Sequence, residues 1–243
     1  MRIYLDLETT GLSVWEDRIT QIGAVATRDK QIISEFSTYV FTDRPIHPSA
    51  EKVTGISNET IKEAPPSDKA LSSFLDWVHE NCQDDEEVVF VAYNGIGYDF
   101  FMLLVEMHRL GWKLEEKLKK VTCVLDPLLW AQTHLDTSTL KRKPSGKCSF
   151  KLGDVHYSVL GENFDNAHDA MADTRAMCRM CNHETFAPML ELEANDPCCV
   201  PTNIYVREFY VKRTQRTKNA KNTKSLSSLL GKKRKISEVA TTN

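Results

Sequence analysis

Apolar and polar residues recur with two different spacings along this chain, and the change from one to the other indicates the order of its elements. Three segments near the start alternate in the manner of β-strands and are rich in branched side chains. A later segment is apolar on both faces, which is typical of a strand buried inside a sheet. With one more short apolar segment, the predicted strands cover residues 2–6, 19–27, 31–41, 88–93 and 121–125.

Helical spacing appears between and after these strands. Residues 67–82 place apolar side chains every three or four positions behind Ser67, whose hydroxyl is suited to cap a helix. The segment from Val53 to Ser57 predicts a turn into another helix. Further helices are predicted over residues 99–110, closed by Gly111, from Pro127, and over residues 169–189. Three strands followed by alternating strands and helices predict an α/β fold, in which a mixed sheet opens as an antiparallel meander and continues with parallel strands flanked by helices.

The composition is that of a globular protein. The 243 residues are 41% hydrophobic and 27% charged, and the longest apolar run, residues 88–93, is far below the roughly 20 residues that cross a bilayer. We therefore expect no membrane partner. Met1 is followed directly by the first strand, with no cleavable signal, and the seven cysteines are best interpreted as reduced, so we expect an intracellular protein.

The net charge of −3 conceals an acidic body and a basic end. Residues 207–243 hold 11 Lys or Arg and two Asp or Glu, which leaves 20 basic and 32 acidic residues in the first 206. This asymmetry indicates contact with a polyanion or a nuclear address, although a basic tail can also have neither role. We divide the chain into a domain of residues 1–190, a C-terminal extension of residues 191–211, and a basic tail of residues 212–243 whose polar composition predicts disorder.

A short cluster in this tail resembles a nuclear localisation signal. It consists of Lys232, Lys233, Arg234 and Lys235. The cluster predicts a nuclear protein that binds an import receptor; without that function, we expect a cytoplasmic protein.

Two carboxylates share one face at the end of the first strand. A period of two puts Asp6 and Glu8 side by side, with Leu5 and Leu7 turned toward apolar packing. Neighbouring carboxylates repel each other unless a cation lies between them. Taken alone, the pair also fits a solvated strand end.

Two further carboxylates and a histidine lie at the predicted helix starts. Asp99 follows the turn after the buried strand, where a simple helix cap is an equal explanation. Asp173 lies just inside the last long helix among small residues, and His168 precedes that helix. These are the places where an open α/β sheet presents ligand sites.

Four carboxylates and one histidine suit hard cations. Oxygen ligands in this number favour Mg²⁺ or Mn²⁺ over Zn²⁺. A pair of such ions about 3.5–4 Å apart can activate water and stabilise the leaving 3′ oxygen in phosphodiester hydrolysis. His168 is our candidate general base, since an unperturbed pKa of about 6.5 suits proton abstraction near neutrality.

The order of these residues resembles the three motifs of the DnaQ-like 3′–5′ exonucleases, in the subgroup with His before the last Asp (DEDDh). The motifs are Asp6-x-Glu8, Asn94-x4-Asp99 and His168-x4-Asp173. Two longer strings look most like the three-prime repair exonuclease branch: Asp6-Leu7-Glu8-Thr9-Thr10-Gly11-Leu12 and Tyr93-Asn94-Gly95-x-x-Tyr98-Asp99-Phe100. The segment from Ile46 to Ile56 also resembles the family. The likeness covers about residues 1–190 and implies a ribonuclease H-like fold.

The resemblance implies a role for each motif residue. Asp6, Glu8, Asp99 and Asp173 would bind two Mg²⁺ ions, with Mn²⁺ as a substitute, and His168 would be the catalytic base. We assign substrate binding to Thr9, Thr10, Gly11, Leu12 and Asn94, with Leu12 packing on the base of the 3′-terminal nucleotide. Stacking of that kind tolerates any base.

The activity implied is a 3′–5′ exodeoxyribonuclease that releases 5′ mononucleotides from single-stranded DNA ends. An exoribonuclease of the same family and a catalytically dead nucleic-acid-binding module are the alternatives, and a homodimer is compatible with the sequence. Roles in DNA repair, in degradation of stray DNA and in viral or mobile-element functions all fit.

A basic loop precedes the last motif where some repair exonucleases carry a proline-rich stretch. Its side chains Lys141, Arg142, Lys143 and Lys147 are candidates to grip a phosphate backbone, and an exposed loop without a ligand is the alternative. Cys178 and Cys181 with His183 have partial zinc spacing, but both cysteines lie on a predicted helix and also fit a core.

Overall fold

A computed structural model describes residues 1–192 and 196–219. The described chain divides into two units, one of residues 1–203 and a second that begins at Ile204. Among the residues described, no helix has the length and apolar character needed to cross a membrane.

The first unit is built on one mixed six-stranded sheet in the order β3-β2-β1-β4-β5-β6. Its strands are β1 (Arg2–Thr9), β2 (Ile19–Arg28), β3 (Gln31–Tyr39), β4 (Val88–Val91), β5 (Val121–Leu125) and β6 (Cys199–Pro201). The first three form an antiparallel meander, β4 and β5 run parallel to β1, and β6 pairs antiparallel with β5. The predicted meander and the parallel strands after it are confirmed.

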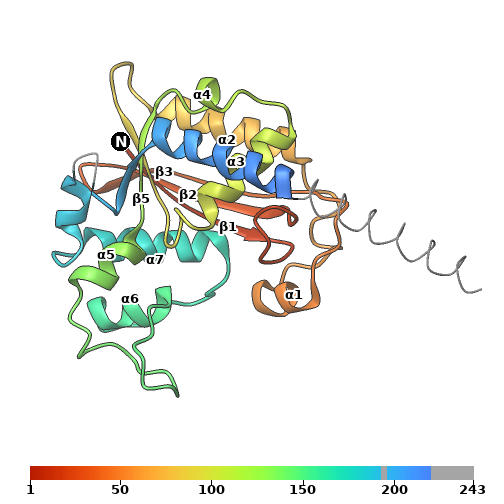
Figure 1. Ribbon diagram of the computed structural model, residues 1–243. Coiled ribbons are helices and arrows are strands. Elements are labelled where there is room, and N and C mark those ends of the chain that lie inside the picture. Colours follow the sequence, from red (N-terminus) through yellow and green to blue (C-terminus); the bar gives the residue numbers. More distant parts are fainter. Residues whose placement is uncertain (193–195, 220–243) are drawn as a thin grey trace, which may run out of the picture. The chain divides into compact units, whose positions relative to one another are not determined.

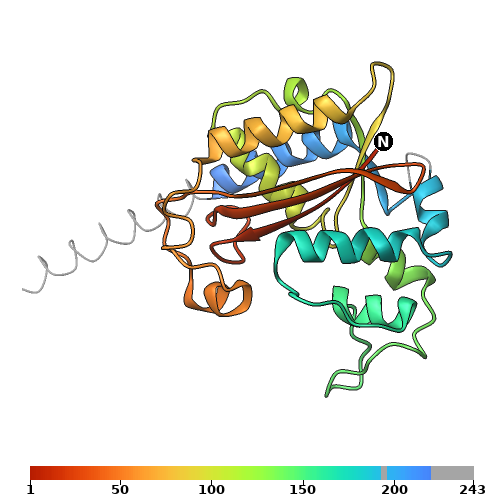
Figure 2. The ribbon, with the colours of Figure 1, turned by 180° about the vertical axis from the view of Figure 1, so that it is seen from behind.

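Helices cover both faces of this sheet (Figures 1 and 2). On one face α2 (Ser67–Asn81) packs on β2 and β3, and α3 (Asp99–Arg109) packs against α2. On the other face α7 (Ala170–Asn182) crosses β1 and β2, with α6 (Leu152–Leu160) beside it. The shorter helices are α1 (Pro48–Thr54), α4 (Leu114–Lys117), α5 (Pro127–His134) and the 3₁₀ helix η1 (Ala187–Glu191).

The two faces of the sheet have cores of different character. Under α2, the ring centroid of Phe74 lies 5.7 Å from that of Phe36 and 6.0 Å from that of Phe90. Under α7 the core is rich in sulfur and includes Met177, Met180 and four buried cysteines, Cys178, Cys181, Cys198 and Cys199. Both sides of β2 are therefore buried, including its polar residues Thr20, Gln21 and Thr27, which the alternating pattern of the sequence did not indicate.

One predicted helix, one predicted cap and one predicted helix end were wrong. The segment from Val53 does not lead into a helix: α1 ends at Thr54, and Gly55 stops it in the left-handed conformation at φ 71°. Ser67 is the first residue of α2 and makes no cap hydrogen bond. The last long helix ends at Asn182, seven residues before the predicted end, and η1 begins at Ala187.

The structure describes part of the predicted C-terminal extension and tail. Residues 191–211 were assigned to an extension, yet β6 within them completes the sheet, and the first unit reaches Asn203. Residues 202–219 are helical, so the part of the predicted disordered tail that is described, residues 212–219, has regular structure. The remainder, with the basic cluster at Lys232–Lys235, lies outside the described residues.

Candidate active site

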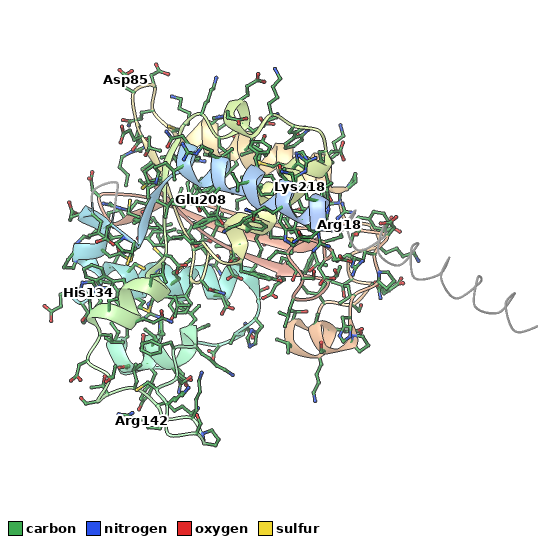
Figure 3. The ribbon with its side chains drawn as sticks, viewed as in Figure 1. Arg18, Asp85, His134, Arg142, Glu208 and Lys218 are labelled. Carbon is green, nitrogen blue, oxygen red and sulfur yellow. The ribbon has the colours of Figure 1, made fainter. Side chains whose placement is uncertain are left out.

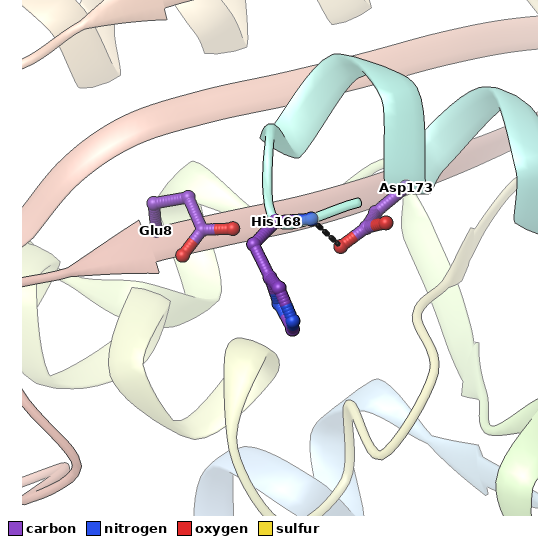
Figure 4. A group of neighbouring side chains, drawn as sticks. All are labelled: Glu8, His168 and Asp173. Atoms are coloured by element: carbon purple, nitrogen blue, oxygen red, sulfur yellow. Dashed lines mark hydrogen bonds between the residues drawn. The ribbon is translucent and has the colours of Figure 1, made fainter. Parts of the chain in front are cut away.

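The end of β1 and the start of α7 bring together three of the predicted site residues. One ligand atom from each of Glu8, His168 and Asp173 lies within 4.8 Å of the others. His168 lies between the two carboxylates, and its backbone N–H donates to Asp173 Oδ2 at 3.1 Å (Figure 4). Glu8 precedes His168 by 160 positions and Asp173 by 165, so their meeting depends on how α7 crosses the sheet.

A glycine on β2 allows that crossing. Gly23 is paired with Asp6 in the β1–β2 register, and a Cβ on it would lie 2.4 Å from the carbonyl carbon of Ala170, in the first turn of α7. The hydroxyl of Thr174 donates to the carbonyl oxygen of Gly23 at 3.2 Å. Only a residue without a side chain lets the helix come this close, and the approach places Asp173 beside β1.

A glutamine on the same strand fixes the start of α7. Gln21, opposite Glu8 in the sheet, donates from Nε2 to Asp169 Oδ2 at 2.9 Å and accepts the N–H of Ala170 at 3.2 Å. Asp169 in turn caps α7 by accepting the N–H groups of Met171 and Ala172. The residue after His168 is therefore held from two sides.

Asp99 reaches the site from the opposite direction, at the first position of α3. Its Oδ1 accepts the N–H of Leu7, the residue between Asp6 and Glu8, at 3.1 Å. The turn that leads to it is anchored by the buried Asp126, which accepts the N–H groups of Asn94 at 2.8 Å and Ile96 at 3.2 Å. Because β1 and β4 are parallel neighbours, their C-terminal ends lie at the same end of the sheet, and the segments that carry Glu8 and Asp99 leave the sheet there.

The gathered carboxylates repel each other. Burial, then Asp173 and Asp99, raise the pKa of Glu8 to about 8. Burial raises the pKa of Asp99 to about 7 and that of Asp173 to about 6. Burial, followed by the charges of Asp99 and Asp173, raises the pKa of Asp6 well above its usual range. Each rise in pKa means that the ionised carboxylate is disfavoured at this position when no cation is bound.

This donor set fits a hard divalent cation. Glu8, His168 and Asp173 already offer ligand atoms within one small volume, and Asp6 and Asp99 add carboxylates coupled to them by charge. Carboxylate oxygens outnumber the single imidazole, as Mg²⁺ and Mn²⁺ prefer and Zn²⁺ does not. The roles of the individual residues in binding and catalysis stay predictions.

A cavity of about 370 Å³ opens beside these carboxylates. Its lining includes Leu7, Glu8, Thr9, Gly11, Leu12, Tyr98 and His168, together with residues of α1. Its lining from α1 consists of Ser49, Ala50, Val53 and Thr54. Leu12 is 90% exposed, an apolar side chain held in solvent at the rim. The lining thus combines apolar side chains, among them Leu12 and Val53, with the polar side chains of Glu8 and His168.

The predicted substrate residues divide into two groups. Thr9, Gly11 and Leu12 line the cavity. Thr10 does not line it: its side chain is buried, its hydroxyl donates to Asp17 at 2.9 Å, and both of its backbone polar groups bind other backbone groups, so its assignment to substrate binding stays a prediction. Asn94 stands exposed in the turn before α3 at φ 61°, and it is not among the lining residues.

The basic loop lies at a second cavity. Lys141 lines this cavity of about 410 Å³ and pairs with Asp154 at 3.4 Å. Arg142, Lys143 and Lys147 are exposed in the loop, which extends beyond α6 on the side away from the sheet (Figure 3). None of the four lines the cavity at β1, so contact with a phosphate backbone stays a prediction.

Within the described ranges, the cysteines with zinc-like spacing belong to the core. Cys178 and Cys181 are buried in α7, and burial raises the pKa of the Cys178 thiol to about 12. The group of candidate metal ligands found in these ranges contains no cysteine. The structure thus supports the core interpretation of the pair.

Sequence reasoning missed three residues that shape the site: Gln21, Asp126 and Asp169. Asp126 precedes Pro127, a pair of residues typical of a helix start, and its cap to Leu128 N–H was detectable from that pattern. Gln21 interrupts an apolar strand, which is a signal for a buried polar contact. Pro48 and Gly55, a proline at a helix start and a glycine at its end, could likewise have identified α1.

Similarity to known proteins covers the same part of the chain. A family model described as Exonuclease matches residues 3–181. A PolC-type DNA polymerase III of Caldanaerobacter subterraneus is 34% identical over 193 residues, which are 78% of this chain and 11% of that protein. The DNA polymerase III subunit epsilon of Treponema pallidum is 36% identical over 102 residues, 42% of this chain and 44% of that protein.

Solved structures share the fold. Exonuclease I of E. coli in complex with a dT13 oligonucleotide has a TM-score of 0.63 at 21% identity, over 74% of this chain and 40% of that one. Another exonuclease I structure reaches a TM-score of 0.65 at 20% identity, over 78% and 43%. This chain spans less than half the length of each of these relatives.

Proposed function

Because this chain belongs to the exonuclease family, we propose that it is a metal-dependent 3′–5′ exonuclease that shortens DNA and releases 5′ mononucleotides. One observation carries the proposal: Glu8, His168 and Asp173 offer ligand atoms within 4.8 Å of one another, Asp6 and Asp99 lie near enough for their charges to act on the same carboxylates, and a cavity of about 370 Å³ adjoins them. A module that only bound nucleic acid would have no physical reason to keep mutually repelling carboxylates.

The four carboxylates would hold the cations, Mg²⁺ being our choice and Mn²⁺ the substitute. When bound, two such ions activate the attacking water and stabilise the leaving 3′ oxygen. The raised pKa of Glu8, about 8, makes proton release part of cation binding near neutral pH.

The remaining residues would bind the strand end and move the proton. Leu12 and the α1 wall with Val53 would enclose the terminal base, and Tyr98 would close the side of the cavity. His168 lines the same cavity, is exposed, and would accept the proton of the attacking water. A cavity lined by apolar side chains at the base position accepts any base, so little sequence preference follows.

The choice of DNA over RNA rests on the relatives. The two relatives named above are DNA polymerase III proteins, and a solved exonuclease I structure holds a dT13 oligonucleotide. An exoribonuclease of the same family would need contacts to the 2′ hydroxyl, and polar side chains at the cavity such as Ser49 and Thr54 are the candidates for them.

The decisive assay offers the full chain matched DNA and RNA oligonucleotides labelled at the 5′ end, in Mg²⁺, in Mn²⁺ and in EDTA. We expect a ladder that shortens from the 3′ end, 5′ mononucleotides as products, and no reaction in EDTA. Cleavage that survives EDTA would exclude the metal mechanism. Faster cleavage of RNA than of the matched DNA would identify RNA as the preferred substrate.

Substitution of Asp173 tests the site itself. Asp173→Asn should lower the rate by a factor on the order of 10² or more while the protein stays folded. Asp165→Asn, an exposed change in the loop just before His168, is the matched control and should keep the wild-type rate. Equal loss in both variants would contradict the proposed site.

Nuclear location, the import receptor at Lys232–Lys235, the part in DNA repair and the homodimer stay proposals from the sequence. The basic cluster lies outside the described residues, so the structure has no bearing on it.

A further inference from the structure

The loop of residues 10–18, which joins β1 to β2, is curled around a buried carboxylate. We name it the substrate loop because Gly11 within it lines the cavity. The carboxylate of Asp17 accepts the Thr10 hydroxyl at 2.9 Å and the Ser13 N–H at 2.8 Å. A Cβ on Gly11 would lie 2.7 Å from Asp17 Oδ2, so the loop has no room for a side chain at this position.

An arginine of α3 holds the outer part of the substrate loop. Arg109 donates from Nη1 to the carbonyl oxygen of Asp17 at 2.7 Å and from Nη2 to that of Trp15 at 2.6 Å. Two carbonyl groups of the loop are thus bound by one planar guanidinium, whose fork fixes their separation.

Glu106 orients this arginine and a second one. Its side chain is 0% exposed. Oε1 accepts Arg18 Nε at 2.6 Å and Arg109 Nη1 at 2.8 Å, and Oε2 accepts Arg18 Nη2 at 3.1 Å. A carboxylate taken out of water is tolerated only with such paired, hydrogen-bonded charges, and Arg18 is itself the last residue of the substrate loop.

The same helix carries a predicted metal ligand. Asp99 begins α3, and Glu106 lies seven residues later, about 10 Å along the helix axis. Tyr98, directly before α3, donates from its hydroxyl to the Gly11 carbonyl at 2.8 Å. One rigid element therefore sets both Asp99 and the wall of the cavity.

We propose that Glu106 is a positioning residue for nucleotide binding: through Arg18 and Arg109 it fixes the substrate loop, and with it the cavity that takes the 3′-terminal nucleotide. The inference rests on the proposed function. Without the carboxylate, the two guanidinium groups repel each other and Arg109 loses the partner that turns its fork toward the loop carbonyls. The loop then moves, while the carboxylates on β1 and α7 stay in place.

The kinetic test compares Glu106→Gln with wild type on a single-stranded DNA oligonucleotide. We expect KM to rise roughly tenfold, the factor that one lost hydrogen bond to a charged group supports, with kcat and the half-saturating Mg²⁺ concentration within about threefold of wild type. The matched control is Glu116→Gln on α4, an exposed glutamate paired with Lys113 at 2.8 Å, which should change neither constant. A fall in kcat at constant KM, or no change in a folded variant, overturns the proposal.

A second readout needs no activity. Hydrogen exchange should become faster in the substrate loop of Glu106→Gln and stay unchanged in α7; equal protection of the loop in both proteins overturns the positioning role. This arm still decides if the wild type proves to have no nuclease activity, a result that would defeat the proposed function alone. If Glu106→Gln does not fold, Arg109→Lys keeps a positive charge beside Glu106 but cannot bind both loop carbonyls, and the same rise in KM and the same faster exchange are expected.

Discussion

Replacement of Glu8 by glutamine should stabilise the metal-free protein while it removes activity. Burial and the charges of Asp173 and Asp99 raise the pKa of Glu8 from 4.5 to about 8. Between those values the folded state keeps a proton that the unfolded chain releases, so the stability of the metal-free wild type falls as pH rises through this range. Glutamine has no such proton, and the variant escapes the loss.

The magnitude follows from the same pKa. At about 1.4 kcal/mol for each pKa unit, the difference between 4.5 and about 8 corresponds to a limit of about 5 kcal/mol at alkaline pH. Glu8 is partly exposed, and screening by solvent reduces this to roughly 2 kcal/mol. For a chain of this length, that energy corresponds to a rise in Tm of roughly 4–8 °C.

The assay is thermal unfolding in EDTA at pH 5 and pH 8.5, with Glu63→Gln as a control at an exposed glutamate. The gap between Glu8→Gln and wild type should be small at pH 5 and full at pH 8.5. Saturating Mg²⁺ should then raise the Tm of wild type more than that of the variant, because the cation binds the intact carboxylates better. Equal midpoints in EDTA at both pH values would refute the idea that repulsion among these carboxylates opposes folding.

Two further outcomes concern the residues that bring the site together. Gly23→Ala should cost roughly 2–3 kcal/mol in urea unfolding, because the added Cβ meets the backbone of Ala170 at 2.4 Å; a loss under about 0.5 kcal/mol would contradict the close approach of α7. Asp126→Ala should cost roughly 2 kcal/mol or more, since the N–H groups of Asn94, Ile96 and Leu128 lose their acceptor. The Asp126→Ala substitution should also loosen the turn before Asp99 and so raise the Mg²⁺ concentration needed for activity. If the free energy of unfolding and this Mg²⁺ concentration both stay unchanged, Asp126 does not anchor the turn.

Local patterns were enough to predict the residues whose placement depends on one element. Period two put Asp6 and Glu8 on one face of β1, and the turn after β4 put Asp99 at the start of α3, as the structure has them. The mixed sheet, with its antiparallel meander followed by parallel strands, was predicted from the order of the apolar segments and from the family resemblance, whereas β6 was not predicted.

What the sequence did not reveal depends on contacts between distant segments. Gln21 looks like an interruption of a buried strand until the register pairs it with Glu8 and α7 crosses above it. Asp126 looks like the cap of α5, yet it also binds N–H groups about 30 residues earlier in the chain. The helix α1 has seven residues, none of them buried, so apolar spacing had nothing to detect.

Strand β6 belongs to the folded unit but lies outside the segment that the family model matches. The family model ends at residue 181, inside α7, but the sheet is finished by Cys199–Pro201, and the compact unit runs to Asn203. A fragment that ended at the family boundary would lack β6, and β5 would become the edge strand of the sheet. The backbone groups of β5 that pair with β6 would then be unpaired, next to Val124 and Leu125, which are buried in the full chain. Such an edge recruits strands from other molecules, so for this chain a boundary drawn from similarity alone would favour aggregation.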